Sequence, residues 1–140
     1  MSLYLEELKR GALSLLIYRN NEIIFSSAGK GIQPVLAAID IVGRTELRDT
    51  TVVDRIVGKA VALLTVYIEA AEVHAAILSQ SAKEVLRKHH VDVVYAKEVT
   101  TILGEDGVDL CPFERLVQEV CDPVEAYERI KALFKAFSNT

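Results

Sequence analysis

The feature that most constrains the fold is an opening hairpin signal, after which β-rich runs alternate with helical patterns. Two β-rich runs, residues 13–18 and 23–26, flank Arg19-Asn20-Asn21-Glu22, and asparagine tolerates the positive φ angles of a tight hairpin turn. Strands that alternate with helices after such a hairpin predict an α/β fold, with a mixed sheet covered by helices on both faces. About five strands is the usual size of such a sheet.

The other elements are assigned from apolar spacing and from helix-capping residues. Residues 43–53 are interpreted as a connection between helices. The stretch from Asp54 to about Ile68 is apolar nearly all round, which predicts a central buried helix with Asp54 at its N-cap. The remaining expected elements are helices over 2–12 and from Ile32 to Val42, strands over 73–78 and 91–96, a helix opening at Ser79 and Ser81, a turn at 105–107, and helices from Pro112 and after Pro123.

Length and composition limit the class of protein. The 140 residues, 51% of them hydrophobic, suit a single domain over residues 1–140. A net charge of −4 argues against nucleic acid as a partner, because such binders need a basic face. No run is long enough to span a membrane, and charges scattered through the first 16 residues do not resemble a signal peptide, so a cytoplasmic location is expected.

Three stretches carry a resemblance to a known family. They are Ala28-Gly29-Lys30-Gly31-Ile32 with Pro34, the run from Asp54 to Ala60 continuing into Ala62-Leu63-Leu64, and Leu110-Cys111-Pro112-Phe113-Glu114. Together with Ser79 and Ser81, they resemble a small prokaryotic family of unknown function, over about residues 13–134. The resemblance implies a cytidine-deaminase-like fold, which is a three-layer α/β sandwich, and it carries no established activity.

The residues that a zinc deaminase needs are missing from the expected positions. Such enzymes take a His or Cys ligand and a glutamate from one helix N-terminus, and two cysteines from a later strand–helix turn. By element order the helix from Asp54 takes the first position, and it contains no His-x-Glu or Cys-x-Glu. If Val57 and Lys59 fall at the ligand and glutamate positions, an apolar side chain and a cation replace them. Residues 78–82 take the second position, without a thiolate. Zinc needs three protein ligands, so we expect no metal, no cofactor and no zinc-dependent deamination. Whether another reaction is catalysed stays open.

A ligand site is nevertheless expected where helix N-termini converge beside the carboxyl ends of the strands. Lys59 lies in an otherwise apolar helix and needs a partner, for which Glu114 or a bound anion would serve. Asp54 would cap its helix or hold a ribose hydroxyl, and Cys111 would be a helix-terminal thiolate or an inert thiol. The candidate ligand-binding residues are Lys30, Asp54, Lys59, Ser79, Ser81, Cys111 and Glu114.

Two functional hypotheses remain. In the first, a metal-free domain binds a nucleoside- or nucleotide-like small molecule, with preference for an anionic or phosphorylated one. In the second, a non-catalytic scaffold retains a deaminase fold for protein interaction. A homo-oligomer, such as a homodimer, is expected in either case. A polar, lysine-bearing pocket favours the first hypothesis, and a cleft filled by Leu and Phe side chains favours the second.

Overall fold

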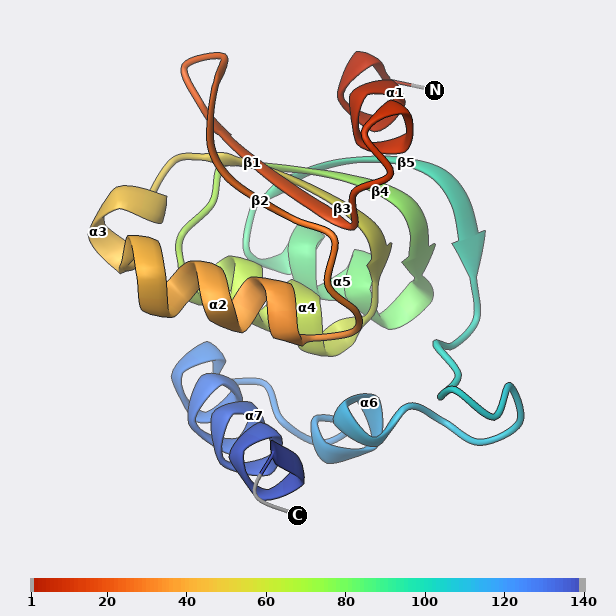
Figure 1. The fold of residues 1–140 in the computed structure, drawn as a ribbon. Helices are drawn as coiled ribbons and strands as arrows, with labels where there is room; N and C mark the ends of the chain where they lie inside the picture. Colours follow the sequence, from red (N-terminus) through yellow and green to blue (C-terminus); the bar gives the residue numbers. More distant parts are fainter. Residues whose placement is uncertain (1, 139–140) are drawn as a thin grey trace.

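A five-stranded sheet with the strand order β2-β1-β3-β4-β5 lies at the centre of the molecule (Figure 1). The computed structural model describes residues 2–138. β1 (Leu15–Arg19) pairs antiparallel with both β2 (Glu22–Ser27) and β3 (Thr51–Val57). β3, β4 (Glu72–Ser79) and β5 (Asp92–Val99) run parallel to one another. The prediction of a mixed sheet of about five strands is confirmed.

The hairpin between β1 and β2 turns at the predicted residues. Arg19 pairs with Glu22, which leaves Asn20 and Asn21 as a two-residue connection. Their φ angles are +49° and +68°, so both lie in the left-handed region that a type I′ turn requires. Asparagine reaches this region at lower cost than most other residues, which is why this pair marks the turn.

Helices cover the two faces of the sheet unequally (Figure 1). We call the face under α1 (Leu3–Arg10) the outer face and the opposite one the inner face. The inner face is covered by α2 (Gln33–Val42), α4 (Lys59–Tyr67) and α5 (Gln80–Lys88), with the short α3 (Arg44–Leu47) between α2 and β3. A further layer, α6 (Pro112–Leu116) and α7 (Pro123–Ser138), packs on α4 (Figure 1).

The segment from Thr51 to Val57 is a strand, so the prediction of a helix starting at Asp54 is wrong. Five of its seven residues are Thr, Val or Ile, whose branched side chains favour the extended backbone, and Gly58 separates the strand from the helix. The helix therefore begins at Lys59, which lies in its first turn rather than the second. The prediction of a plain connection over 43–53 is also wrong, since it contains α3 and the start of β3.

The central buried helix itself is confirmed as α4. Every residue from Ala60 to Thr65 is buried, because the sheet lies on one side of α4 and α7 on the other. The hydroxyl of Thr65 donates to the carbonyl of Val61, which satisfies this polar group inside the core. The predicted positions of α1, α2, α5, α6, α7, β4 and β5 are confirmed as well.

One irregularity crosses all three parallel strands at the same level. Arg55, Ala76 and Ala96 have no partner in the registers of the parallel strand pairs. The side chains that point to the inner face before and after these residues are three residues apart instead of the usual two. Tyr95 and Glu98 accordingly both contact Lys83 of α5. The corresponding inward pairs are Asp54 and Val57 in β3, and Ala75 and Leu78 in β4. The spacing returns Val57 and Leu78 to the core near the ends of β3 and β4, just before α4 and α5 begin.

Candidate functional site

The N-terminus of α4 is capped by a carboxylate from a distant part of the chain. Glu114 Oε1 accepts a hydrogen bond from the backbone N–H of Lys59 at 2.8 Å, and Oε2 accepts one from Ala60 at 2.7 Å. The first N–H groups of a helix lack partners within it and carry partial positive charge, so a carboxylate is a favourable partner. The anion that we expected at a helix N-terminus is therefore a side chain of the protein itself.

Gly58 makes this contact sterically feasible. A Cβ at this position would lie 2.4 Å from Glu114 Oε1, which is far inside van der Waals contact. The φ angle of Gly58 is −97°, a value open to any residue, so the backbone conformation does not require glycine here. The requirement comes from the close approach of the carboxylate.

The charge of the Glu114 carboxylate is offset by the groups around it. Burial raises the pKa of Glu114, while the N–H groups of Ala60 and Lys59 and the ammonium of Lys59 act in the opposite direction. The Lys59 ammonium donates to the backbone carbonyl of Gln118 at 2.9 Å. Glu114 therefore meets Lys59 through the backbone N–H of the lysine, whereas the ammonium is held by the segment that follows α6.

The other predicted site residues lie apart from this cap or serve local structure. Ser79 is fully buried and is the N-cap of α5, accepting from Ala82 N–H at 3.1 Å, and its hydroxyl lies 3.3 Å from that of Ser81. Lys30 is exposed on the turn before α2. Cys111 occupies the N-cap position of α6 and makes no capping hydrogen bond there.

Asp54 is a buried strand residue and does not cap a helix. It shares the inner face with its pairing partners Leu15 and Ala75, and it is only 8% exposed. Burial raises the pKa of Asp54 to about 7, against the opposing effect of the Ile56 and Arg55 N–H groups. Oδ1 accepts from Ile56 N–H at 3.3 Å, next to the strand irregularity.

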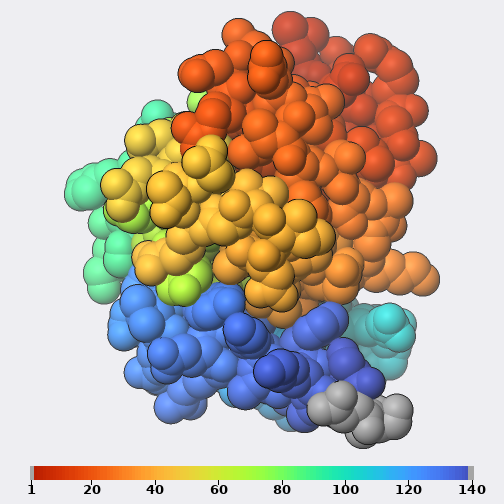
Figure 2. Space-filling view, turned by 60° about the vertical axis from the view of Figure 1, so that its left-hand side comes forward, coloured from red at the N-terminus to blue at the C-terminus, as the bar shows by residue number. Residues whose placement is uncertain are grey.

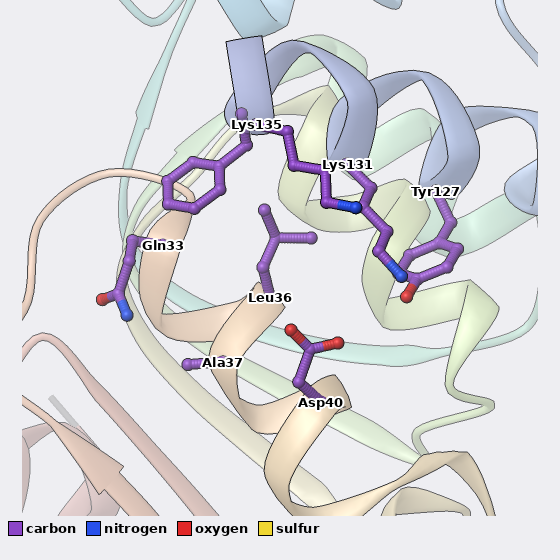
Figure 3. A pocket seen from close by; sticks show the side chains of 8 residues that line it. Gln33, Leu36, Ala37, Asp40, Tyr127, Lys131 and Lys135 are labelled. Atoms are coloured by element: carbon purple, nitrogen blue, oxygen red, sulfur yellow. The ribbon is translucent and has the colours of Figure 1, made fainter. Parts of the chain in front are cut away.

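A hollow lies between α2 and α7, on the side of the molecule seen in Figure 2, where the α7 surface adjoins that of α2 and α3. Its volume is about 210 Å³, and Figure 3 shows the side chains of the two helices facing each other across it. We call it the interhelical groove. It is lined by Gln33, Leu36, Ala37 and Asp40 of α2 and by Tyr127, Lys131, Phe134 and Lys135 of α7. None of the seven predicted site residues lines it.

Two of the groove residues, Tyr127 and Lys131, belong to a stack of two aromatic rings and two cations. Tyr67 of α4 and Tyr127 of α7 stack with centroids 4.3 Å apart. The Arg44 guanidinium lies 3.9 Å from the centroid of Tyr67, and the Lys131 ammonium lies 5.5 Å from that of Tyr127. The hydroxyl of Tyr127 and the charge of Asp40 raise the pKa of Lys131, which keeps it cationic in the groove.

Sequence reasoning missed the interhelical groove because its residues resemble ordinary helix surface. Tyr127, Lys131 and Lys135 recur every four residues, which indicates one helix face. Gln33 and Asp40 are two turns apart on α2. Only the packing of α7 beside α2 brings the two faces together, and that contact is not encoded in local spacing.

Residues 2–138 form neither a metal-binding cluster nor a membrane-spanning helix. No group of three or more His, Cys, Asp or Glu side chains in residues 2–138 is arranged to hold a metal ion. Over the same range, no helix has both the length and the apolar character needed to cross a bilayer.

Comparison with known proteins gives a family. No curated protein matches the chain significantly. A crystal structure of a DUF1893 family protein from Thermotoga maritima superimposes with a TM-score of 0.81 at 28% sequence identity, covering 94% of this chain and 91% of that one. The model of the TM1506 family, described as a domain of unknown function (DUF1893), matches residues 4–134. Because this match spans nearly the whole chain, the protein belongs to the TM1506 (DUF1893) family.

Proposed function

We propose that this domain binds a small, anionic, nucleotide-like molecule in the interhelical groove. The observation that carries the proposal is the pair Lys131 and Lys135, which share an apolar floor with Asp40 of α2. Ligand sites typically combine an apolar lining with a few polar groups that fix orientation. A lysine-bearing hollow was the feature that favoured ligand binding over the scaffold hypothesis.

Each wall of the groove offers a different interaction. The two lysines of α7 suit a phosphate or carboxylate group. Phe134 and Leu36 provide an apolar surface for a planar ring. Asp40 can accept hydrogen bonds from hydroxyl or amino groups, and the Gln33 amide can both accept and donate them. This combination of charge, ring and hydroxyl recognition is what a nucleoside monophosphate presents.

The size of the groove limits what it can hold. Ligand pockets usually measure roughly 300–1,000 Å³, so a hollow of about 210 Å³ accommodates part of a nucleotide, with the remainder on the exposed rim. The N-terminus of α4 is a poorer site in this conformation, because Glu114 already accepts its hydrogen bonds. The site first expected at Lys30, Lys59 and Ser79 would need that carboxylate to move away.

The proposal also covers the type of fold and the absence of zinc-dependent deamination. An opening hairpin followed by alternating helices and strands supports a cytidine-deaminase-like fold. In the corrected element order, β3 precedes α4, and the β3–α4 turn of Val57, Gly58 and Lys59 offers no His, Cys or Glu. We therefore propose a metal-free binding domain that does not deaminate cytidine, which metal analysis and a cytidine deamination assay of the purified protein would check.

Thermal-shift titration with a panel of nucleosides, nucleoside monophosphates and inorganic phosphate tests the binding proposal. A ligand at a hundred times its Kd stabilises the folded state by about 2.7 kcal/mol, which is a readily measured shift. The double variant Lys131→Ala/Lys135→Ala should lose this stabilisation. The matched control is Lys97→Ala, an exposed lysine on β5. Equal stabilisation of all three proteins, or of none, would contradict the proposal.

A scaffold function is the second candidate, and the outer face of the sheet favours it. Ile23 and Val94 pair with Tyr18 and His74, so they lie on the face that α1 covers only in part, and they are 50% and 41% exposed. Apolar groups left exposed on a sheet are frequent contact points for partners. Light scattering of the wild type and of Val94→Lys would test self-association. A dimer that this charge dissociates, in a protein that no nucleotide stabilises in the thermal-shift titration, would support the scaffold hypothesis.

A further inference from the structure

Three polar side chains meet on the outer face of the sheet, away from the interhelical groove. Ser2 is the N-cap of α1, and its Oγ lies 3.0 Å from Nδ1 of His74 in β4. The other ring nitrogen of His74, Nε2, contacts the carboxylate of Glu72. The His74 side chain is 7% exposed and that of Glu72 is 37% exposed, whereas Ser2 is half-buried. Residues far apart in sequence thus form one hydrogen-bonded chain.

The positions of the protons in the Ser2–His74–Glu72 series follow from which groups can donate and which can only accept. An ionised carboxylate only accepts hydrogen bonds, so contact with Glu72 places the ring proton of neutral His74 on Nε2. Nδ1 then presents a lone pair, and the Ser2 hydroxyl donates to it. A hydroxyl, a basic ring nitrogen and an orienting carboxylate in this order are the groups that activate a serine nucleophile.

The surroundings of Ser2 and His74 also favour activation of the serine hydroxyl as a nucleophile. The Tyr4 ring meets the imidazole edge-on with centroids 4.8 Å apart, which limits the access of water to the ring. The backbone N–H of Leu5 donates to Ser2 Oγ at 3.2 Å and would stabilise negative charge developing on that oxygen. Leu3, which follows the serine, is 83% exposed and offers an apolar contact for a substrate.

We propose that Ser2, His74 and Glu72 form a nucleophilic site that takes acyl groups from small apolar esters. Ser2 Oγ attacks the ester carbonyl, and its proton passes to His74 Nδ1. The C–O bond to the alcohol then breaks, and the alkoxide leaves with the proton from Nδ1. Water, deprotonated by the same nitrogen, releases the acid and restores the serine. The carboxylate of Glu72 orients the imidazole and stabilises its charged form.

Labelling with a fluorophosphonate probe tests this site directly, because such probes react with activated serines. Intact-mass analysis should show one adduct on the wild type, and peptide mapping should place it on Ser2. His74→Gln should slow labelling by about 100-fold or more, and Glu72→Gln by about tenfold or more. Ser26→Ala removes an exposed serine of β2 and should change nothing. Lys97→Ala should also label normally, and Ser2 lies on the outer face, away from the groove between α2 and α7, so this test is independent of the groove.

The outcomes separate catalysis from a purely structural role of the same contacts. If Ser2 and His74 only fasten α1 to the sheet, their replacement lowers stability but the wild type does not label at Ser2. If His74→Gln does not fold, Glu72→Gln decides, because its side chain is partly exposed and outside the core. The proposal is overturned if the wild type carries no adduct at Ser2, or if Glu72→Gln labels as fast as the wild type.

Discussion

The ring of Tyr127 lies parallel to that of Tyr67, with 9° between the two planes, and this contact joins the C-terminal helix to the central one. Tyr127→Ala should lower the free energy of unfolding by about 2 kcal/mol, because it removes a stacked pair and the apolar area that the half-buried ring covers. Tyr127→Phe keeps the stack and should cost less than about 1 kcal/mol. Urea denaturation of the two variants checks this, and equal losses would mean that the ring contact contributes little.

Removal of the carboxylate cap on α4 should be costly although no apolar core is lost. Glu114→Ala leaves the N–H groups of Lys59 and Ala60 without their partner, and we expect a loss of about 2 kcal/mol in the free energy of unfolding. The control is Glu119→Ala, an exposed glutamate a few residues later, which should change stability by less than about 0.5 kcal/mol. Similar losses in the two variants would show that the cap is not a major source of stability.

Addition of one methyl group at Gly58 should reproduce the loss of the cap. Gly58→Ala places a Cβ where Glu114 Oε1 now lies and should displace that carboxylate. The double variant with Glu114→Ala should then be less destabilised than the sum of the two single variants. Gly104→Ala is the matched control, because the nearest atom to its added Cβ is 3.6 Å away. Strictly additive effects of Gly58→Ala and Glu114→Ala would show that the added methyl group does not act by displacing the Glu114 carboxylate.

The buried carboxyl of Asp54 should make stability depend on pH. Its pKa is raised from 3.8 to about 7 by burial, so the folded state holds this proton more tightly than the unfolded state does. This contribution is fully present below about pH 4 and is lost as the pH rises through 7, by up to about 4 kcal/mol. Asp54→Asn cannot ionise, so the difference in stability between variant and wild type should grow from pH 5 to pH 8. A constant difference in urea denaturation across that range would contradict this.

The sequence predicted most of the fold because local signals and tertiary environment agree along most of the chain. The Asn20-Asn21 turn, the Ser79 cap and the Pro112 helix start each have a local physical cause that packing does not override. The error at Asp54 arose because a run of apolar residues fits a buried helix and a buried strand equally well. The branched residues on either side of Asp54, and Gly58 after them, were the signal that could have separated the two.

The candidate site was harder to predict, because its contacts join segments that are distant along the chain. The sequence offered Glu114 or a bound anion as the partner of the Lys59 ammonium, but that ammonium contacts the Gln118 carbonyl, and Glu114 caps the backbone instead. The pair Ser2 and His74 is 72 residues apart, and the interhelical groove joins α2 to α7. Such meetings follow from how layers pack, which local periodicity does not encode.

The origin of the α4 cap also has a consequence for biosynthesis. Lys59 leaves the ribosome 55 residues before Glu114, so the nascent chain contains the most buried helix of the protein well before the carboxylate that completes it. During that interval the first N–H groups of α4 have only water or transient partners. We therefore expect the N-terminal two thirds of the protein to stay vulnerable to proteases during translation, until the last quarter of the chain has emerged and docked.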